Sequence, residues 1–167
     1  MGEASHTEGY STVADQYSHA EGEKTVASGR ASHAEGNNTR AVSTNSHAEG
    51  FESRALGEGA HAEGYRTYAT GAYSHVEGRY NAIDQKGDYA HIVGIGTSPS
   101  DRRNGHTVDW NGNGTYAGMV TANGGLTLAS GTGYGQDIPE DTDEGRIFFM
   151  PDNTADWIVE YAQKSIG

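Results

Sequence analysis

The amino-acid sequence predicts an all-β protein that begins as a parallel β-roll of stacked 14-residue coils and ends in a smaller, hairpin-rich region. The first observation is a motif, Ser-His-Ala-Glu-Gly at residues 32–36, which recurs at a nearly constant spacing. The second is that large apolar residues are sparse between Met1 and Gly87. A fixed period with too few side chains for an ordinary core indicates a solenoid, whose coils bury surface by stacking on one another.

Six copies of the motif lie in register, and a degenerate seventh copy follows them. They occupy residues 5–9, 18–22, 32–36, 46–50, 60–64, 74–78 and 90–94. Successive histidines are separated by 13 residues, then four times by 14, and finally by 16. In the first five copies a Thr or Ser lies seven residues after the repeat start and an Ala lies nine residues after it, so the period covers both halves of each coil.

The charge balance restricts the possible partners. The chain of 167 residues carries 23 acidic and 11 basic residues, a formal net charge of −12. Low apolar content with high net charge is typical of disorder, but a disordered chain needs no repeat register. The acidic balance argues against nucleic-acid binding, because phosphates attract a basic surface. The absence of cysteine excludes disulfides and thiolate metal sites, and no stretch is apolar enough to predict membrane insertion.

Alternation along a strand predicts which residues face inward. In an extended segment His33 and Glu35 share one face, whereas Ser32, Ala34 and Gly36 share the other. Two strands of about five residues per coil would leave room only for small side chains, so we expect Ser, Ala and Thr inside the roll. The motif glycine is expected to make the turn, where positive backbone angles favour it. The His and Glu then point outward, and their uniformity predicts contact with another copy of the chain.

The outward histidines and glutamates form a predicted ladder between subunits. These residues are His6, Glu8, His19, Glu21, His33, Glu35, His47, Glu49, His61, Glu63, His75, Glu77 and His91. Parallel strands about 4.8 Å apart would place each His on a His and each Glu on a Glu. We interpret the ladder as structural, with imidazoles and carboxylates hydrogen-bonded across the interface. Capture of a metal ion or an anion is the alternative, since both ligand types suit zinc, iron or nickel.

The ladder also predicts a pH dependence of stability. A His beside a Glu is expected to have a raised pKa and the Glu a lowered one, so that stability would peak between the two values. Six equivalent His-x-Glu units argue against catalysis, which needs groups with different pKa values. We therefore expect no catalytic residue and no cofactor.

The composition changes after Ile83, and this change predicts a second region. We place the boundary at Gly87, with the roll over residues 1–87 and a β-rich region over residues 88–167. Two Asn-Gly turns predict hairpins over residues 107–117 and 119–129. The apolar side chains expected to form a small core there are Trp110, Tyr116, Val120, Leu126 and Leu128.

The last part of the chain contains an acidic run and two apolar segments. The run at 137–144 is interpreted as a solvated loop, because its spacing matches no calcium-binding loop. Residues 146–150 and 157–161 are expected to be strands, although a short helix is the alternative for the second segment.

The repeat resembles the left-handed parallel β-rolls in the head domains of trimeric autotransporter adhesins, in which Val and Ile are typical where this chain has His and Glu. The His-Ala-Glu-Gly form, with the later stretches 89–97, 106–113 and 144–149, is more similar to the distal regions of tailed-phage fibres and neck appendages and to related prophage proteins. This resemblance covers most of the chain and implies a homotrimeric, virion-associated, extracellular segment used in host attachment. Some members of that group continue into a self-cleaving intramolecular chaperone, described as a peptidase domain, whose catalytic residues have no assignable counterpart here.

Two classes of function follow from these observations. The first is a non-enzymatic fibre segment whose outward side chains contact a glycan or protein receptor on a bacterial surface, although exposed tyrosines are also ordinary in strands. The candidate contact residues are Tyr10, Phe51, Tyr65, Arg66, Tyr68, Tyr73 and Tyr80. A bacterial adhesin head is a close relative of this class. The second class is an enzyme, either self-cleaving or glycan-degrading, but glycan hydrolysis needs a carboxyl pair in different environments and none stands apart from the repeats.

Overall fold

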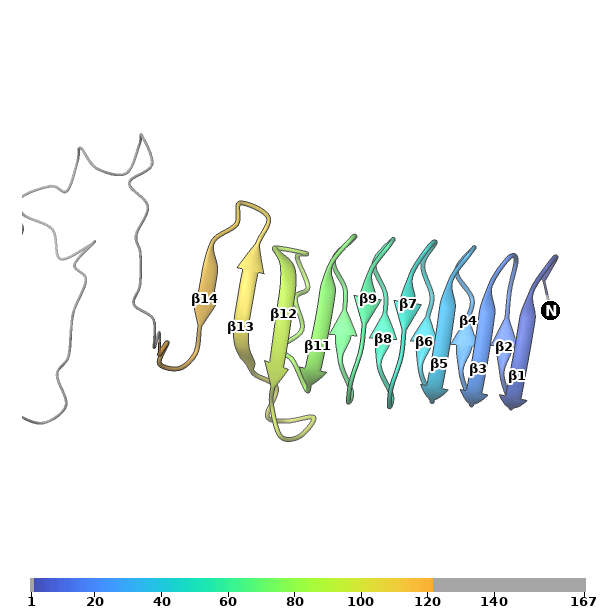
Figure 1. The fold of residues 1–167 in the computed structure, drawn as a ribbon, viewed down its shortest axis with the longest axis horizontal. Helices are drawn as coiled ribbons and strands as arrows, with labels where there is room; N and C mark the ends of the chain where they lie inside the picture. The colour runs from blue at the N-terminus through green and yellow to red at the C-terminus, as the bar shows by residue number, and fades with distance from the viewer. Residues whose placement is uncertain (1, 122–167) are drawn as a thin grey trace, which may run out of the picture. The chain divides into compact units, whose positions relative to one another are not determined.

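The computed structural model describes residues 2–121 of the chain. Within them the chain forms fourteen β-strands and no helix, which confirms the predicted all-β class. Figure 1 shows these strands stacked one behind another along a single axis. No helix in this part of the chain is therefore available to cross a membrane.

Each regular coil contributes one strand to each of two parallel sheets. The longer sheet has the spatial order β1 (His6–Tyr10), β3 (His19–Glu23), β5 (His33–Asn37), β7 (His47–Ala48), β9 (His61–Ala62), β11 (His75–Arg79), β12 (Tyr89–Ile95), β13 (Asn104–Asp109) and β14 (Gly114–Tyr116). The shorter sheet has the order β10 (Tyr68–Ala69), β8 (Arg54–Ala55), β6 (Arg40–Ala41), β4 (Val26–Ala27) and β2 (Val13–Ala14). The second strand of each coil is thus two residues long, shorter than the five residues expected.

Small side chains fill the interior of the roll, as the alternation predicted. The buried apolar residues of the coils are Ala14, Ala20, Ala27, Ala34, Ala41, Ala48, Ala55, Ala60, Ala62, Ala69, Val76 and Ile92. The repeated Ser and Thr are buried beside them. The Ser32 hydroxyl donates to the carbonyl of Gly29 at 2.7 Å, and the Thr39 hydroxyl donates to the carbonyl of Glu35 at 3.0 Å. These two hydroxyls therefore satisfy backbone carbonyls inside the coil, where an unpaired acceptor would be costly.

The motif glycine is required for two reasons. Gly36 has a φ of 104°, and a Cβ atom there would lie 2.2 Å from the carbonyl oxygen of Gly50 in the next coil. However, Gly36 lies within β5, and the corner that follows is made by Asn38, with a φ of 55°. The Asn38 amide donates to the carbonyl of Glu23 in the preceding coil at 2.7 Å. The expectation that glycine alone makes the turn is therefore wrong, since a hydrogen bond between coils holds a non-glycine residue in the left-handed region.

The roll ends differently in its two sheets. The longer sheet continues past Gly87, because β12 pairs in parallel with β11 and places His91 opposite His75. The shorter sheet ends at β10, and the side chain of Asn81 takes the place of a further strand. The Asn81 carboxamide accepts from the Tyr68 amide at 2.8 Å and donates to the Tyr68 carbonyl at 3.1 Å.

An antiparallel extension follows the last parallel strand. β13 pairs with β12, and β14 pairs with β13 across a turn in which the Asp109 carboxylate accepts from the amides of Asn111 and Asn113. Trp110, Tyr116 and Val120 are 51%, 57% and 59% exposed, so in this chain they do not form the small core expected of them. Thr121 is the last residue described.

Several predicted features lie outside the described residues. These are Leu126 and Leu128, the hairpin over 119–129 beyond Thr121, the acidic run 137–144, and the strands expected at 146–150 and 157–161. They belong to Ala122–Gly167, whereas Met1–Thr121 forms a unit of its own.

Candidate functional site

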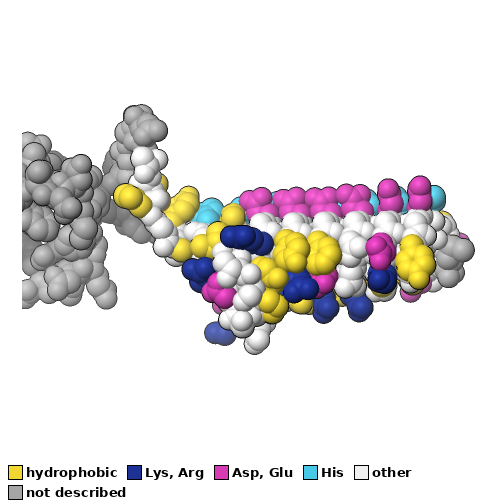
Figure 2. Space-filling model, turned by 90° about the horizontal axis from the view of Figure 1, so that it is seen from below, with side chains coloured by type: hydrophobic (Ala, Val, Ile, Leu, Met, Phe, Trp, Pro, Cys, Tyr) yellow, Lys and Arg dark blue, Asp and Glu magenta, His cyan; other side chains and the backbone are white. Residues whose placement is uncertain are grey.

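The ladder residues lie on the outward face of the longer sheet, because from β3 to β11 they alternate along each strand with a buried alanine or, in β11, a buried valine. Figure 2 shows the carboxylates as a stripe along one edge of the roll, with histidines beside it. Consecutive imidazole rings from His19 to His75 stack with centroids 4.6–4.7 Å apart and at most 17° between their planes. The contacts made by His6 and His91 are edge-on or tilted. Strand register thus gathers all of the predicted ladder residues into two adjacent columns.

The direction of His–Glu pairing changes in the middle of the ladder. From β1 to β7 each imidazole pairs with the carboxylate two residues later in its own coil, whereas from β9 onward it pairs with the carboxylate of the preceding coil. Glu49 lies at the change. Its Oε2 is 4.0 Å from Nε2 of His47, and its Oε1 is 3.9 Å from Nε2 of His61. One carboxylate therefore lies between two stacked imidazoles.

The carboxyl groups of Glu49 and Glu63 also interact with each other, and this interaction moves their pKa values in opposite directions. The hydrogen bond to Glu63, followed by burial and by Glu35, raises the pKa of Glu49 to about 7. The same hydrogen bond favours the ionised form of Glu63 and lowers its pKa. Burial lowers the pKa of both His47 and His61, and the neighbouring imidazoles act in the same direction.

These directions correct the expected pH dependence. Raised pKa values were expected for the histidines and lowered values for the glutamates, and of the four central residues only Glu63 follows that pattern. The physical reason is the stacking itself. An imidazole between two others loses hydration and would place like charges next to each other, and both effects oppose its protonation.

Within one chain the hydrogen-bond network of the ladder is incomplete. The Nε2 atoms of His19, His33, His47 and His61 are shielded from solvent and have no hydrogen-bond partner within residues 2–121. Their distances to carboxylate oxygens are 3.7–4.0 Å, which is beyond hydrogen-bonding range. Side-chain rotations that bring the carboxylate oxygens about 1 Å closer to the Nε2 atoms would close these contacts.

Two groups in the ladder have the ligand types for a metal ion. They are His47 with Glu49 and His61, and His61 with Glu63 and His75, and the ligand atoms within each group lie within 4.8 Å of one another. An imidazole binds a metal through a lone pair in the plane of its ring. The rings of His47 and His61 are only 3° from parallel, and those of His61 and His75 only 4°, so their lone pairs cannot converge on one ion. The stack would have to open before either group could coordinate.

A second cluster combines aromatic rings with arginine at one corner of the coils. The rings of Phe51 and Tyr65 stack at 4.9 Å, and the guanidinium of Arg66 lies within 6 Å of both rings and of the Tyr80 ring. Arg66 also donates to the Glu52 carboxylate at 2.9 Å. Tyr65 is 42% exposed, whereas Tyr80 is only 7% exposed, so the expected outward position of Tyr80 is wrong. Figure 2 shows apolar and basic side chains together on the flank below the carboxylate stripe.

Sequence reasoning missed Arg102, which joins this cluster from a distant part of the chain. Its guanidinium lies 4.4 Å from the ring centroid of Tyr68 and donates to the Arg66 carbonyl at 3.0 Å. The two arginines are 36 positions apart and Arg102 is outside the repeats, so no local pattern signals the contact. Of the remaining expected contact residues, Tyr10 and Tyr73 are exposed.

No protein-family model, curated protein or solved structure matches the chain.

Proposed function

We propose that this chain is a segment of a homotrimeric fibre, a left-handed β-roll in which the ladders of three copies face one another around the fibre axis. The observation that carries the proposal is the exposure of the ladder. In the central coils the side chains of His33, Glu35, His47, Glu49 and His61 are 30–41% exposed in a single chain, yet the same two residue types recur in all six regular copies of the motif. Solvent would accept many polar residues there, whereas a contact surface requires particular ones.

The small core supports the same proposal. Apart from Val76, Tyr80 and Ile92, the buried apolar residues of the coils are alanines. Apolar burial contributes roughly 25 cal/mol per Å², and alanine offers little area. Chains with so small a core commonly gain stability by oligomerising. Packing of three ladders would bury the imidazole stacks and hold the carboxylates in hydrogen-bonding range of the Nε2 atoms.

We further propose that the fibre belongs to a phage tail or appendage, is extracellular, and attaches the virion to a bacterial surface. The support is the sequence resemblance together with aromatic and basic groups outside the ladder, such as the exposed Tyr10 and Tyr73 and the partly buried Arg66. The receptor is a glycan or a protein. The proposed role is structural and non-enzymatic, and it needs neither a cofactor nor nucleic acid.

The solution mass tests the assembly. Three chains of 17.7 kDa should give about 53 kDa by light scattering. Replacing His33, His47 and His61 together by Asp should dissociate the trimer, because like charges then meet on the axis. The control is Tyr10→Ser on the exposed first coil, which should leave the mass unchanged. A folded 17.7 kDa monomer would contradict the proposal.

Attachment is tested separately from assembly. Purified trimer should bind to the surface of susceptible bacteria and compete with phage adsorption. If the trimer forms normally but binds no bacterial surface, the assembly proposal stands and the receptor-binding role is contradicted. Appearance of a second fragment on electrophoresis of a longer, freshly made chain would instead support the self-cleaving alternative.

A further inference from the structure

A hollow opens where the repeat period lengthens. The step from His75 to His91 is 16 residues in place of 14, and the extra length lies in the segment before Tyr89. Earlier in the roll the backbones touch at this corner, since a Cβ atom on Gly57 would lie 2.1 Å from the carbonyl oxygen of Gly71. One coil later the atom nearest to a Cβ atom on Gly71 would be the Cα of Gly87, at 3.1 Å, and no backbone oxygen is among its close neighbours. The wider spacing leaves a hollow of about 410 Å³.

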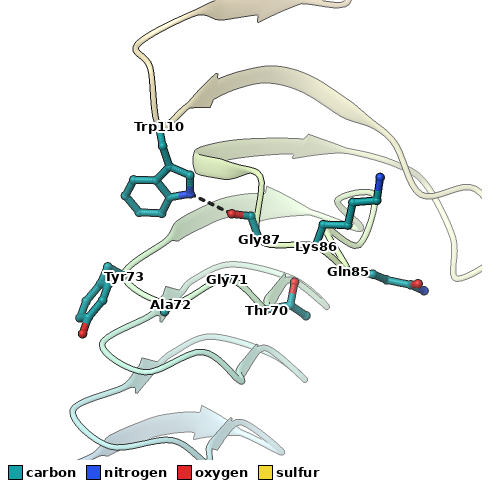
Figure 3. Close-up of a pocket in the computed structure, with 8 residues that line it drawn as sticks. All are labelled: Thr70, Gly71, Ala72, Tyr73, Gln85, Lys86, Gly87 and Trp110. Atoms are coloured by element: carbon teal, nitrogen blue, oxygen red, sulfur yellow. Dashed lines mark hydrogen bonds between the residues drawn. The ribbon is translucent and has the colours of Figure 1, made fainter.

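Two aromatic rings border one side of this hollow. Figure 3 shows the indole of Trp110 and the phenol of Tyr73 on the same side, with the backbone of Gly71 and Ala72 beside them. Trp110 and Tyr73 are 51% and 67% exposed. The Trp110 Nε1–H donates to the Gly87 carbonyl at 2.8 Å, which fixes the indole orientation and satisfies its one polar group. A half-exposed indole held in this way presents a rigid apolar surface to solvent.

Polar groups border the opposite side. The side chains of Gln85 and Lys86 are exposed, and Figure 3 shows them on the other side of the hollow from the two rings, with their terminal groups turned away from the rings. They offer an amide and an ammonium group as hydrogen-bond donors. The Thr70 hydroxyl lies between the two sides and donates to the Asp84 carbonyl, so its oxygen can still accept a hydrogen bond.

We propose that this hollow binds a pyranose ring of a bacterial-surface polysaccharide. A pyranose has apolar C–H faces and a rim of hydroxyl groups, which match the aromatic side and the polar side respectively. The volume is within the range of about 300–1,000 Å³ that is typical of small-molecule sites. This inference rests on the proposed attachment function and gives its receptor a chemical class and a position.

The test is NMR titration of the whole chain with a panel of methyl pyranosides: glucoside, galactoside, mannoside, rhamnoside and N-acetylglucosaminide. At least one sugar should shift the indole N–H signal of Trp110, with an affinity on the order of 1 mM. Trp110→Ala and Tyr73→Ala should each weaken that binding at least about tenfold. Lys86→Ala, a change on an exposed side chain that leaves the roll intact, should weaken it about threefold.

Tyr17→Ala is the matched control, since Tyr17 is 46% exposed, lies in an early coil far along the sequence from Trp110, and is not among the expected receptor contacts, so the change should not affect sugar binding. Absence of any shift from the whole panel, or unchanged binding in both aromatic variants, would overturn the inference. If the Trp110→Ala trimer still attaches to bacteria as well as the parent protein, the hollow is not the receptor site while the fibre function stands. Failure of the parent trimer itself to attach to bacteria would count against the attachment function.

Discussion

Glu49 and His61 lie in successive coils with 3.9 Å between Oε1 of the carboxylate and Nε2 of the imidazole. The other oxygen of Glu49 lies 4.0 Å from His47 in its own coil. A single carboxylate thus joins two coils at the point where the pairing direction of the ladder changes. The coils therefore do not carry independent ion pairs, and a change in the chemistry of one coil should affect the next.

The raised pKa of Glu49 predicts a pH-dependent effect of Glu49→Gln. The folded state holds the proton up to a pKa of about 7, against an ordinary value of 4.5, so it binds more protons than the unfolded state between these values. The contribution of this group to stability therefore falls as pH rises from 4.5 to 7. Removing the carboxyl should make the variant more stable than the parent at pH 8, by about 1 kcal/mol, with little difference at pH 4.5.

Urea unfolding of both proteins across this pH range, with a chelator present, measures the effect. Glu8→Gln is the control, because the Glu8 side chain is 71% exposed at the first coil, and its difference from the parent should not change over the same window. A Glu49→Gln curve that runs parallel to the parent curve from pH 4.5 to 8 would mean that the contact with Glu63 does not raise the pKa of Glu49.

Gly36→Ala should be strongly destabilising. Its φ is 104°, and the added methyl group would lie 2.2 Å from a backbone oxygen of the next coil. We expect a loss of about 2–5 kcal/mol from the strained backbone and the forced separation of the coils. Gly112→Ala is the matched control, because Gly112 also has a positive φ, 83°, but has nothing within 4 Å of its Cβ position.

The control should therefore lose only the backbone part, about 1–2 kcal/mol, as measured by urea unfolding. Equal losses in the two variants would show that backbone conformation alone, and not contact between coils, requires glycine at position 36.

The period of the sequence was enough to predict like-on-like stacking, because parallel pairing of identical coils must place His33 on His47. It was not enough to locate the corners, since the left-handed position after each motif has no characteristic residue type. The residues found there are Ser11, Lys24, Asn38, Glu52, Arg66 and Tyr80. The signs of the pKa shifts were also unpredictable from pairing alone, because they depend on ring stacking and on the contact between two carboxyl groups of different coils.

The parallel orientation of the rings predicts that the ladder does not retain a metal ion. His47 and His61 would have to leave a stack with 3° between ring planes before both could coordinate one ion. We expect less than one ion of zinc or nickel per three chains after gel filtration, and the same melting temperature before and after treatment with EDTA. Stoichiometric metal that is lost on treatment with EDTA, with a fall in melting temperature, would show that the stack opens and that the ladder is a binding site.

Asn81 should be essential to the end of the shorter sheet. Its buried side chain accepts from the amide of Tyr68 and donates to the carbonyl of the same residue, as a neighbouring strand would. Asn81→Ala leaves both backbone groups without this partner and should cost about 2–4 kcal/mol. Asn111→Ala, on an exposed turn, is the control and should cost less than about 0.5 kcal/mol.

Hydrogen exchange distinguishes this capping role from simple loss of packing. In the Asn81→Ala protein the amide of Tyr68 should exchange much faster than in the parent, whereas the His61 amide, which donates to the Ser74 carbonyl in the longer sheet, should keep its protection. Asn81→Asp retains the acceptor for the Tyr68 amide and removes the donor, so it should protect that amide better than Ala does. Unchanged protection of Tyr68 in the alanine variant would mean that the sheet ends there without help from Asn81.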